Sequence, residues 1–198
     1  DPRLGDARLC GTTASLCGVE AAVYQQDPFL LERAISCDLT LHAWMLSQSG
    51  IPVIYSGDEI GQLNDYTYHD DPEKRDDSRY IHRGNFQWDL AALRTGGETR
   101  QGKQFQGLRR LEMLRAQEPC FDSRADVWVE DSGSSHVLAL CRKLEDRELV
   151  CLFNFSGEFV QAGVERDGSW SELMYGTHYD QIRDITLYPY GFAWLLRD

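Results

Sequence analysis

The sequence predicts an incomplete α/β part followed by an all-β antiparallel sandwich. Residues 28–49 contain no helix breaker and lead almost directly into a short apolar run, residues 51–55, which is the helix-to-strand step of an α/β fold. After Pro119 the apolar residues change from helical spacing to alternation, and turn residues separate short segments. One buried strand cannot form a sheet alone, so residues 1–119 are predicted to be the closing portion of a larger α/β domain.

Helix signals fill the first fifty residues. Apolar side chains at helical spacing predict a short helix within residues 8–25. Asp27 is a typical N-cap and Pro28 suits the first helical position, so the next helix is expected to begin there and to end at Gly50. Apolar residues lie on nearly every face of this segment, which indicates a buried helix.

The run at residues 51–55 is predicted to form a strand buried on both faces, with polar residues directly after it. The loop 56–99 is longer than the ~12–15 residues beyond which a structureless loop is usually functional or disordered. Its tyrosine, phenylalanine and tryptophan residues favour an ordered, functional loop. Residues 102–118 carry one apolar stripe, which predicts an amphipathic surface helix ended by Pro119.

The rest of the chain predicts short strands separated by turns, as in an antiparallel sandwich. Two domains follow from this change, residues 1–119 and residues 120–198. The strand candidates are residues 127–129, 136–142, 149–155, 159–164, 171–174, 182–187 and 191–196.

Composition excludes some partners. The chain has 198 residues, is 42% hydrophobic and 26% charged, and carries a formal net charge of −12, which argues against nucleic acid and anionic membranes as partners. No apolar run approaches the ~20 residues of a membrane span, and the first residues lack signal-peptide features. The start at Asp1-Pro2 indicates a piece of a longer chain, with a processed N-terminus as the alternative. Six cysteines without a CxxC pair indicate reduced thiols in a cytoplasmic protein.

The segment that follows the predicted strand resembles a known family. Residues 50–55 with Gly57-Asp58-Glu59-Ile60-Gly61 are similar to the eighth barrel strand of the α-amylase superfamily, the family-13 glycoside hydrolases. Residues 154–156 and 187–190 resemble the C-terminal β-domain of that superfamily. Four further segments resemble amylosucrases: Arg8-Leu9-Cys10-Gly11-Thr12, Leu63-Asn64-Asp65, Asp76-Asp77-Ser78-Arg79 and His82-Arg83.

The resemblance implies that the whole enzyme is a (β/α)8 barrel and that this chain contains a fragment of that TIM barrel. It also implies a retaining mechanism that uses two carboxylates. Those carboxylates belong to strands four and five, before Asp1, so the chain is given no catalytic residue. No cofactor and no metal are expected. The resemblance implies that the sugar-binding arginines of amylosucrase-like enzymes correspond to Arg8 in the segment 8–12 and to Arg79 in Asp-Asp-Ser-Arg. The chemistry suits this role, because the donors of a planar guanidinium match vicinal hydroxyls. Arg83 is a weaker candidate, since Gly84 stands where the family usually has proline.

Structural roles compete with these assignments. Arg79 could instead order its loop by an ion pair with Asp71, Asp76 or Asp77, and Arg8 could be a surface charge. Asp58 and Glu59 could both point into the sugar pocket, or both could cap the following loop.

Other candidates favour structural roles. The carboxylates of Asp70, Asp71, Asp76 and Asp77 fit a solvated charge network better than a calcium site, because basic residues are interspersed. His42 is expected to be packed in the core. Three tryptophans could form a sugar-stacking platform, but in strands they are more often packed; these are Trp128, Trp170 and Trp194.

The resemblance implies the C-terminal part of a sucrose-active glucosyl transferase, with hydrolysis as its side reaction. The piece itself is expected to be inactive, and sucrose or an α-glucan is the partner of the whole enzyme together with the missing barrel portion. Another superfamily glucosidase, active on trehalose or maltose, is an alternative. A non-catalytic carbohydrate-binding or interaction module is the alternative of another class. The apolar face of the incomplete domain also predicts a possible dimer.

Overall fold

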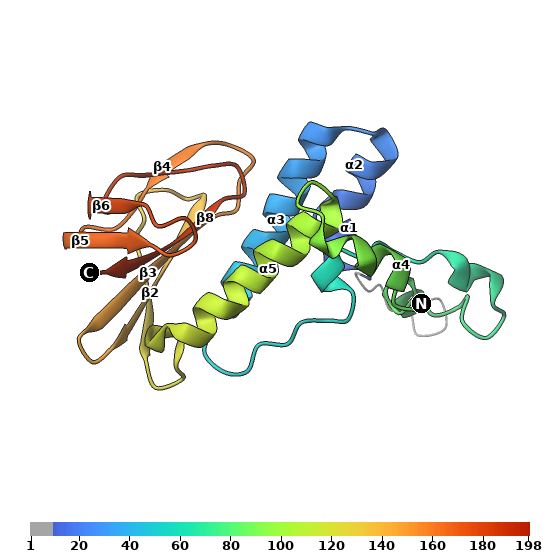
Figure 1. The fold of residues 1–198 in the computed structure, drawn as a ribbon, viewed down its shortest axis with the longest axis horizontal. Coiled ribbons are helices and arrows are strands. Elements are labelled where there is room, and N and C mark those ends of the chain that lie inside the picture. Colours follow the sequence, from blue (N-terminus) through green and yellow to red (C-terminus); the bar gives the residue numbers. More distant parts are fainter. Residues whose placement is uncertain (1–9) are drawn as a thin grey trace. The chain divides into compact units, whose positions relative to one another are not determined.

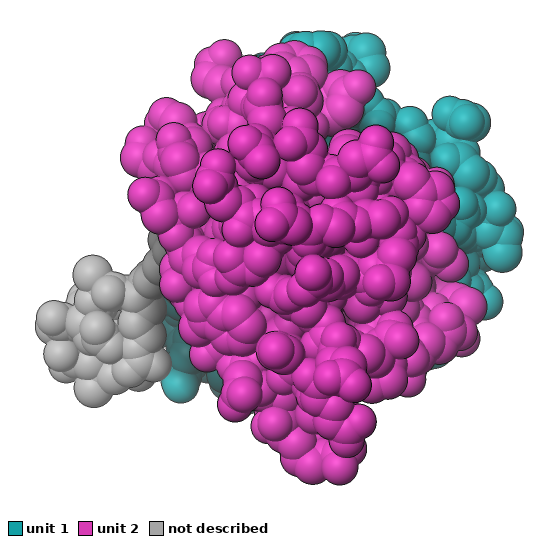
Figure 2. Space-filling view, turned by 90° about the vertical axis from the view of Figure 1, so that its left-hand side faces the viewer, with its two compact units in different colours: residues 1–38, 54–106 teal, residues 39–53, 107–198 magenta. Residues whose placement is uncertain are grey.

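The computed structural model describes residues 10–198, and these fold into two compact units (Figures 1 and 2). Unit 1 comprises residues 1–38 and 54–106, and unit 2 comprises residues 39–53 and 107–198. Two long helices, α3 (Pro28–Leu46) and α5 (Arg100–Gln117), each contribute residues to both units. The predicted domain boundary at residues 119–120 stays a prediction, because these units are divided within helices.

Unit 1 is helical in its described residues. The helix predicted within residues 8–25 is two helices, α1 (Thr13–Leu16) and α2 (Val19–Gln25), because Gly18 between them has φ +97°. The predicted N-cap of α3 is confirmed: Oδ1 of Asp27 accepts hydrogen bonds from the backbone N–H groups of Phe29 (2.9 Å) and Leu30 (3.0 Å). The long loop holds short helical segments: η1 (Asp58–Ile60), η2 (Thr67–Asp70), η3 (Ser78–His82), α4 (Trp88–Ala91) and η4 (Ala92–Thr95).

Helix α3 is buried on one side only. Ala34, Ile35 and Ala43 are at most 5% exposed, whereas Phe29 is 73% exposed. The expectation of a helix buried all round is therefore wrong for the described residues, because a helix buries only the faces that other elements cover. The helix also ends at Leu46, before Gly50.

The prediction of a buried strand at residues 51–55 is wrong. These residues form no strand, and the side chains of Ile51 and Val53 are 92% and 76% exposed. An apolar run is a buried parallel strand only where neighbouring strands lie along both of its edges. Among the described residues the first strand begins at Asp126, so no such neighbour is present.

Unit 2 is a sandwich of antiparallel strands, as predicted, together with the ends of α3 and α5 (Figure 1). Its larger sheet has the order β1-β2-β3-β8-β5-β6, and β4 pairs with β7 in a second sheet. The core contains Cys141 and Leu152 from the larger sheet and Ala162 and Leu187 from the smaller one. The strands are β1 (Asp126–Glu130), β2 (Val137–Leu144), β3 (Arg147–Asn154), β4 (Val160–Ala162), β5 (Asp167–Glu172), β6 (His178–Gln181), β7 (Ile185–Leu187) and β8 (Phe192–Arg197).

Two strands differ from the prediction. Strand β5 begins at Asp167, before the strand candidate 171–174, and it includes Gly168, which has φ +108°; its register with β6 shifts between Asp167 and Trp170. Strand β6 was not predicted because its sequence is polar and lacks alternation. It lies at the edge of the sheet, where polar side chains are tolerated. No helix in the described part of the chain has the length and apolar character needed to cross a membrane.

Arg142 on β2 is the most deeply buried charge of unit 2, with 0% exposure. Its Nε donates to the carbonyl oxygen of Cys120 (2.6 Å), Nη1 to that of Ser47 (2.7 Å) and Nη2 to that of Asp122 (3.0 Å). The guanidinium also lies 5.9 Å from the ring centroid of Phe121. One side chain therefore joins β2, the segment η5 (Pro119–Phe121) and the residue that follows α3.

A second arginine, Arg115, donates hydrogen bonds at the C-terminal end of α3. Nη1 of Arg115 donates to the carbonyls of Leu46 and Gln48, and Nη2 donates to that of Gly50 (2.9 Å). The last carbonyls of a helix have no intrahelical partners and carry partial negative charge. Two guanidinium groups therefore satisfy the carbonyls at and beyond the C-terminal end of α3.

Replacing Arg142 by methionine should destabilise the 198-residue chain by about 3 kcal/mol or more, because the carbonyls of Ser47, Cys120 and Asp122, two of them buried, would lose their donors. Urea unfolding followed by circular dichroism measures this loss. Arg124→Met is the matched control, since the side chain of Arg124 is 76% exposed and pairs with Asp122 at the surface; its loss should stay within about 0.5 kcal/mol. Equal stability of the two variants would contradict the role assigned to Arg142.

Candidate functional site

The candidate site is the part of unit 1 that follows residue 56. Gly57 has φ +103°, and a Cβ atom there would lie 2.9 Å from the Cβ of Gln62, so the turn requires glycine. A side-chain oxygen of Asp58 accepts from the backbone N–H of Tyr55 (3.2 Å), and Glu59 accepts from that of Gly57 (2.8 Å). Both carboxylates therefore stabilise this turn, which is the capping role given as the alternative for Asp58.

Asn64 joins this segment to α1. Its Oδ1 accepts from the backbone N–H of Thr12 (2.9 Å), and its own N–H donates to Oγ of Ser15 (3.1 Å). Its Nδ2 donates to a carboxylate oxygen of Glu20 on α2 (3.1 Å). Thr12, in the first amylosucrase-like segment, is therefore in contact with Asn64 in the second.

The segment 76–79 contacts the first of these segments, and the residues on either side of His82-Arg83 contact Asp65. Sγ of Cys10 lies 3.6 Å from Oγ of Ser78, and the backbone N–H of Asp65 donates to the carbonyl of Ile81 (2.8 Å). A Cβ at position 84 would lie 2.7 Å from Oδ2 of Asp65. This close approach explains why Gly84 stands where proline was expected.

Arg79 forms an ion pair with Asp77. Its Nε lies 2.8 Å from Oδ1 and 3.0 Å from Oδ2 of Asp77, and its Nη2 lies 2.6 Å from Oδ2. Oδ1 also accepts from the backbone N–H of Arg79 (3.0 Å), so Asp77 caps η3 and orients the guanidinium together. The hydrogen bond from Arg79 holds the pKa of the Asp77 carboxyl well below its usual range. Nη1 of Arg79 takes no part in this pair.

Of the other two candidate arginines, Arg83 lies within the described residues and Arg8 does not. The guanidinium of Arg83 lies 5.9 Å from the ring centroid of Tyr80, and Nζ of Lys74 lies 5.8 Å from the same centroid. The side chain of Arg83 is exposed. Arg8 lies outside the described residues.

The acidic loop forms ion pairs with its own basic residues. Asp71 pairs with Lys74 at 2.9 Å, and Asp77 pairs with Arg79. Within residues 10–198 no group of three or more His, Cys, Asp or Glu side chains is placed to hold a metal ion. The charge-network interpretation therefore accounts for the described contacts.

Packing explains the aromatic and histidine candidates. Trp170 and Trp194 are fully buried, so they pack in the sandwich, and Trp128 is partly buried with its Nε1 donating to Glu130 (2.6 Å). His42 is 4% exposed, as expected for a histidine packed in a core.

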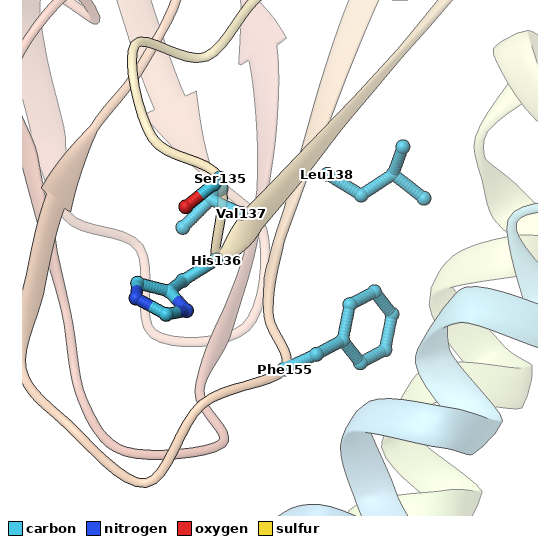
Figure 3. A pocket seen from close by; sticks show the side chains of 5 residues that line it. All are labelled: Ser135, His136, Val137, Leu138 and Phe155. Atoms are coloured by element: carbon cyan, nitrogen blue, oxygen red, sulfur yellow. The ribbon is translucent and has the colours of Figure 1, made fainter.

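Sequence reasoning missed a pocket of about 380 Å³ in unit 2, at the ends of β2 and β3. Figure 3 shows its five lining side chains, which belong to Ser135, His136, Val137, Leu138 and Phe155. It has no carboxylate, so it lacks the acid and nucleophile that glycoside chemistry needs. No sequence motif marks it.

The Asp77 carboxyl should remain ionised at pH 3, because its hydrogen bonds with Arg79 stabilise the charged form. A ¹³C NMR titration of the side-chain carboxyl measures this directly. Replacing Arg79 by alanine should return its pKa toward the ordinary value near 4. Lys74→Ala is the matched control, since Lys74 pairs with Asp71 and should leave the Asp77 titration unchanged. An ordinary Asp77 pKa in the unaltered chain would show that the pair does not persist in solution.

Comparison with known protein families matches part of unit 2. Residues 129–194 match the family described as "Maltogenic Amylase, C-terminal domain". This match lies within unit 2 and covers most of its strands.

Solved structures of α-amylase-family enzymes share the fold. A variant of AmyP in complex with maltotriose is 18% identical, with a TM-score of 0.66 over 85% of this chain and 38% of that chain. The trehalulose synthase MutB from Pseudomonas mesoacidophila MX-45 is 16% identical, with a TM-score of 0.60 over 81% of this chain and 38% of that one. The maltogenic amylase from S. marinus is 20% identical, with a TM-score of 0.56 over 81% of this chain and 19% of that chain. The chain thus spans less than half the length of these enzymes and is similar in fold to their corresponding part.

Proposed function

We propose that this chain is the C-terminal part of an amylosucrase-like enzyme of the α-amylase superfamily, which transfers glucose from sucrose to a glucan. The supporting observation is the contact among described residues of three segments, Cys10 and Thr12 in the first, Asn64 in residues 63–65 and Ser78 in residues 76–79. These are three of the segments whose residues resemble amylosucrases. The family match of residues 129–194 supports the superfamily and not the substrate.

In this proposal residues 1–119 are the end of a (β/α)8 barrel and residues 120–198 are the C-terminal β-domain. The exposed apolar residues Ile51 and Val53 would be covered by the neighbouring barrel strands of the whole enzyme. The same exposed side chains would support dimers of the isolated piece. The nucleophile and the acid/base lie outside this chain, so no residue here has a catalytic role.

Arg79 is the principal sugar-binding residue in the proposal. Asp77 fixes its Nε and Nη2, which leaves Nη1 to donate to sugar hydroxyls in a defined plane. Arg8 and Arg83 are proposed as further donors, and Asp58 as a residue that stabilises its own turn and accepts from a sugar hydroxyl. No cofactor or metal enters this scheme.

The net charge of −12 supports a neutral substrate and disfavours nucleic acid and anionic membranes. Six free cysteines support a cytoplasmic location.

A second candidate is a glucosidase of the same superfamily that acts on maltooligosaccharides or trehalose. The match to maltogenic amylase C-terminal domains favours it, and AmyP was solved with maltotriose. A non-catalytic carbohydrate-binding module is the candidate of another class. Calorimetric titration of the 198-residue chain separates the classes, because tight maltotriose binding by this piece alone would favour the module.

In the whole enzyme, Arg79→Ala should lower kcat/KM for sucrose about 10- to 100-fold, because one charged donor is worth about 1.5–3 kcal/mol. Glucose and fructose release measures the rate, and the melting temperature should change little because this ion pair is at the surface. Lys74→Ala, which removes a neighbouring surface charge, is the matched control.

Unchanged sucrose turnover in Arg79→Ala would remove Arg79 from the sugar site. The 198-residue chain alone is the negative control, because the proposal gives it no nucleophile. Release of glucose from sucrose by this chain above a buffer blank would contradict the proposal.

A further inference from the structure

The pocket of unit 2 has a lining that combines apolar and polar side chains. The ring of Phe155 and the side chains of Val137 and Leu138 are its apolar part, and the Ser135 hydroxyl and the His136 imidazole are its polar part (Figure 3). Its volume of about 380 Å³ lies within the range of about 300–1,000 Å³ that small-molecule pockets span. None of the five lining side chains is a carboxylate, a lysine or an arginine, so the pocket suits a neutral ligand.

A buried serine fixes the turn that carries the polar part of the lining. Ser132 is 5% exposed, and its Oγ donates to the carbonyl of Val137 (2.7 Å) and accepts from the backbone N–H of Ser134 (3.3 Å). The backbone N–H of His136 donates in turn to Oγ of Ser134 (3.3 Å). Ser135 and His136 therefore lie on an ordered turn.

A buried asparagine fixes the loop on the other side of the pocket. The side chain of Asn154 is fully buried at the end of β3, and its Nδ2 donates to the carbonyls of Glu158 and Tyr188, both at 2.8 Å. Its Oδ1 accepts from the backbone N–H (2.9 Å) and from the hydroxyl (2.7 Å) of Ser156. The loop that begins at Phe155 is therefore held by one side chain with four hydrogen bonds.

The Phe155 ring is fixed in place and remains accessible. It stacks on the ring of Phe153, with 6.2 Å between the ring centroids and 22° between the planes, and Phe155 is 43% exposed. The backbone N–H of Phe155 donates to the carbonyl of His136 (3.0 Å), which joins the two sides of the pocket. Because both sides are ordered before a ligand arrives, binding costs little conformational entropy.

A second exposed aromatic surface lies beside residues that Asn154 holds. Phe159 and Tyr188 are 64% and 69% exposed, and their ring centroids are 5.1 Å apart. Phe155 and Phe159 are four residues apart, so their Cα atoms lie at most about 14 Å from each other. A ligand made of several linked rings is long enough to contact both surfaces.

We propose that this pocket binds a glucose unit of an α-glucan. The C–H face of a pyranose ring is apolar and stacks on the Phe155 ring, while the hydroxyl rim forms hydrogen bonds with Ser135 and His136. A neutral sugar also avoids the repulsion that the net charge of −12 exerts on anions. The inference rests on the proposed function only for the choice of an α-glucan as the sugar.

The test follows the folded 198-residue chain by NMR while maltotriose is added. The chain has five histidines, and we expect the imidazole resonances of His136 to shift and saturate while those of the other four stay in place. Binding should be weak, with a millimolar Kd, because a pocket of this size contacts little more than one sugar ring. Tight binding would instead indicate a carbohydrate-binding module. Absence of a saturable shift at His136 would overturn the inference.

Three variants test the lining directly. Phe155→Ala should weaken maltotriose binding about tenfold because the stacking surface is lost, whereas Phe155→Trp should retain it. His136→Ala, at an exposed position, should weaken binding several-fold without changing the melting temperature. Tyr175→Ala is the matched control, since it removes an aromatic ring of unit 2 that is 86% exposed and does not line the pocket. Equal affinity of Phe155→Ala and Tyr175→Ala would contradict the proposed site.

The sucrose proposal and this inference can fail separately. In the whole enzyme, Phe155→Ala should release glucose and fructose from sucrose at an unchanged rate, because Phe155 has no part in the sugar site proposed around Arg79. Normal sucrose turnover without a shift at His136 would overturn the pocket alone. A saturable shift at His136 in a protein that does not cleave sucrose would support the pocket and contradict the sucrose proposal.

Discussion

Unit 2 depends on a positive charge buried among carbonyl groups. The guanidinium of Arg142 is out of contact with solvent, and its described hydrogen bonds all go to carbonyl or hydroxyl oxygens. Burial lowers the pKa of Arg142, yet arginine stays protonated in proteins, so the charge must be stabilised locally. The carbonyl of Ser47, just beyond the end of α3, supplies partial negative charge for this purpose. The cost of burying this charge is therefore offset only when β2, η5 and the end of α3 are assembled together.

Helices α3 and α5 also contact each other within unit 1. Nε2 of Gln104 on α5 donates to Oδ1 of Asp38 on α3 (2.7 Å), and both residues are buried. Further along the same pair, in unit 2, a Cβ at Gly107 would lie 2.6 Å from Cδ1 of Leu39, so the helices approach closely there and need glycine. Helix α1 is joined to the candidate site through Asn64. In unit 1, therefore, specific polar contacts join α3 to α5 and α1 to the candidate segments.

Local signals predicted much of the fold. Asp27 and Pro28 marked the start of α3, the apolar stripe with Leu108 and Leu111 predicted α5, and alternation predicted most strands of the sandwich. Strand β6 was missed because an exposed edge strand shows no apolar alternation. The strand prediction for residues 51–55 was wrong for another reason. β-Branched residues favour strand conformation, but a strand forms only where neighbouring strands can pair with it.

The candidate site was predictable only in part. The Arg79–Asp77 pair was one of the alternatives that the residues left open, since opposite charges two residues apart readily meet. The role of Asn64 could not be predicted, because its partners Thr12 and Ser15 are about fifty residues away and no local pattern links them. Whether Arg79 binds a sugar stays a proposal.

Native-state hydrogen exchange tests most directly whether the buried arginine makes unit 2 one cooperative structure. The amide of Ser47, which donates to the carbonyl of Ala43, and the amide of the fully buried Leu152 on β3 are the probes. Exchange of both by the same global opening, with free energies within about 1 kcal/mol, is the predicted result. Exchange of Ser47 through an opening several kcal/mol below that of Leu152 would contradict it, because the end of α3 would then fray independently of the sandwich.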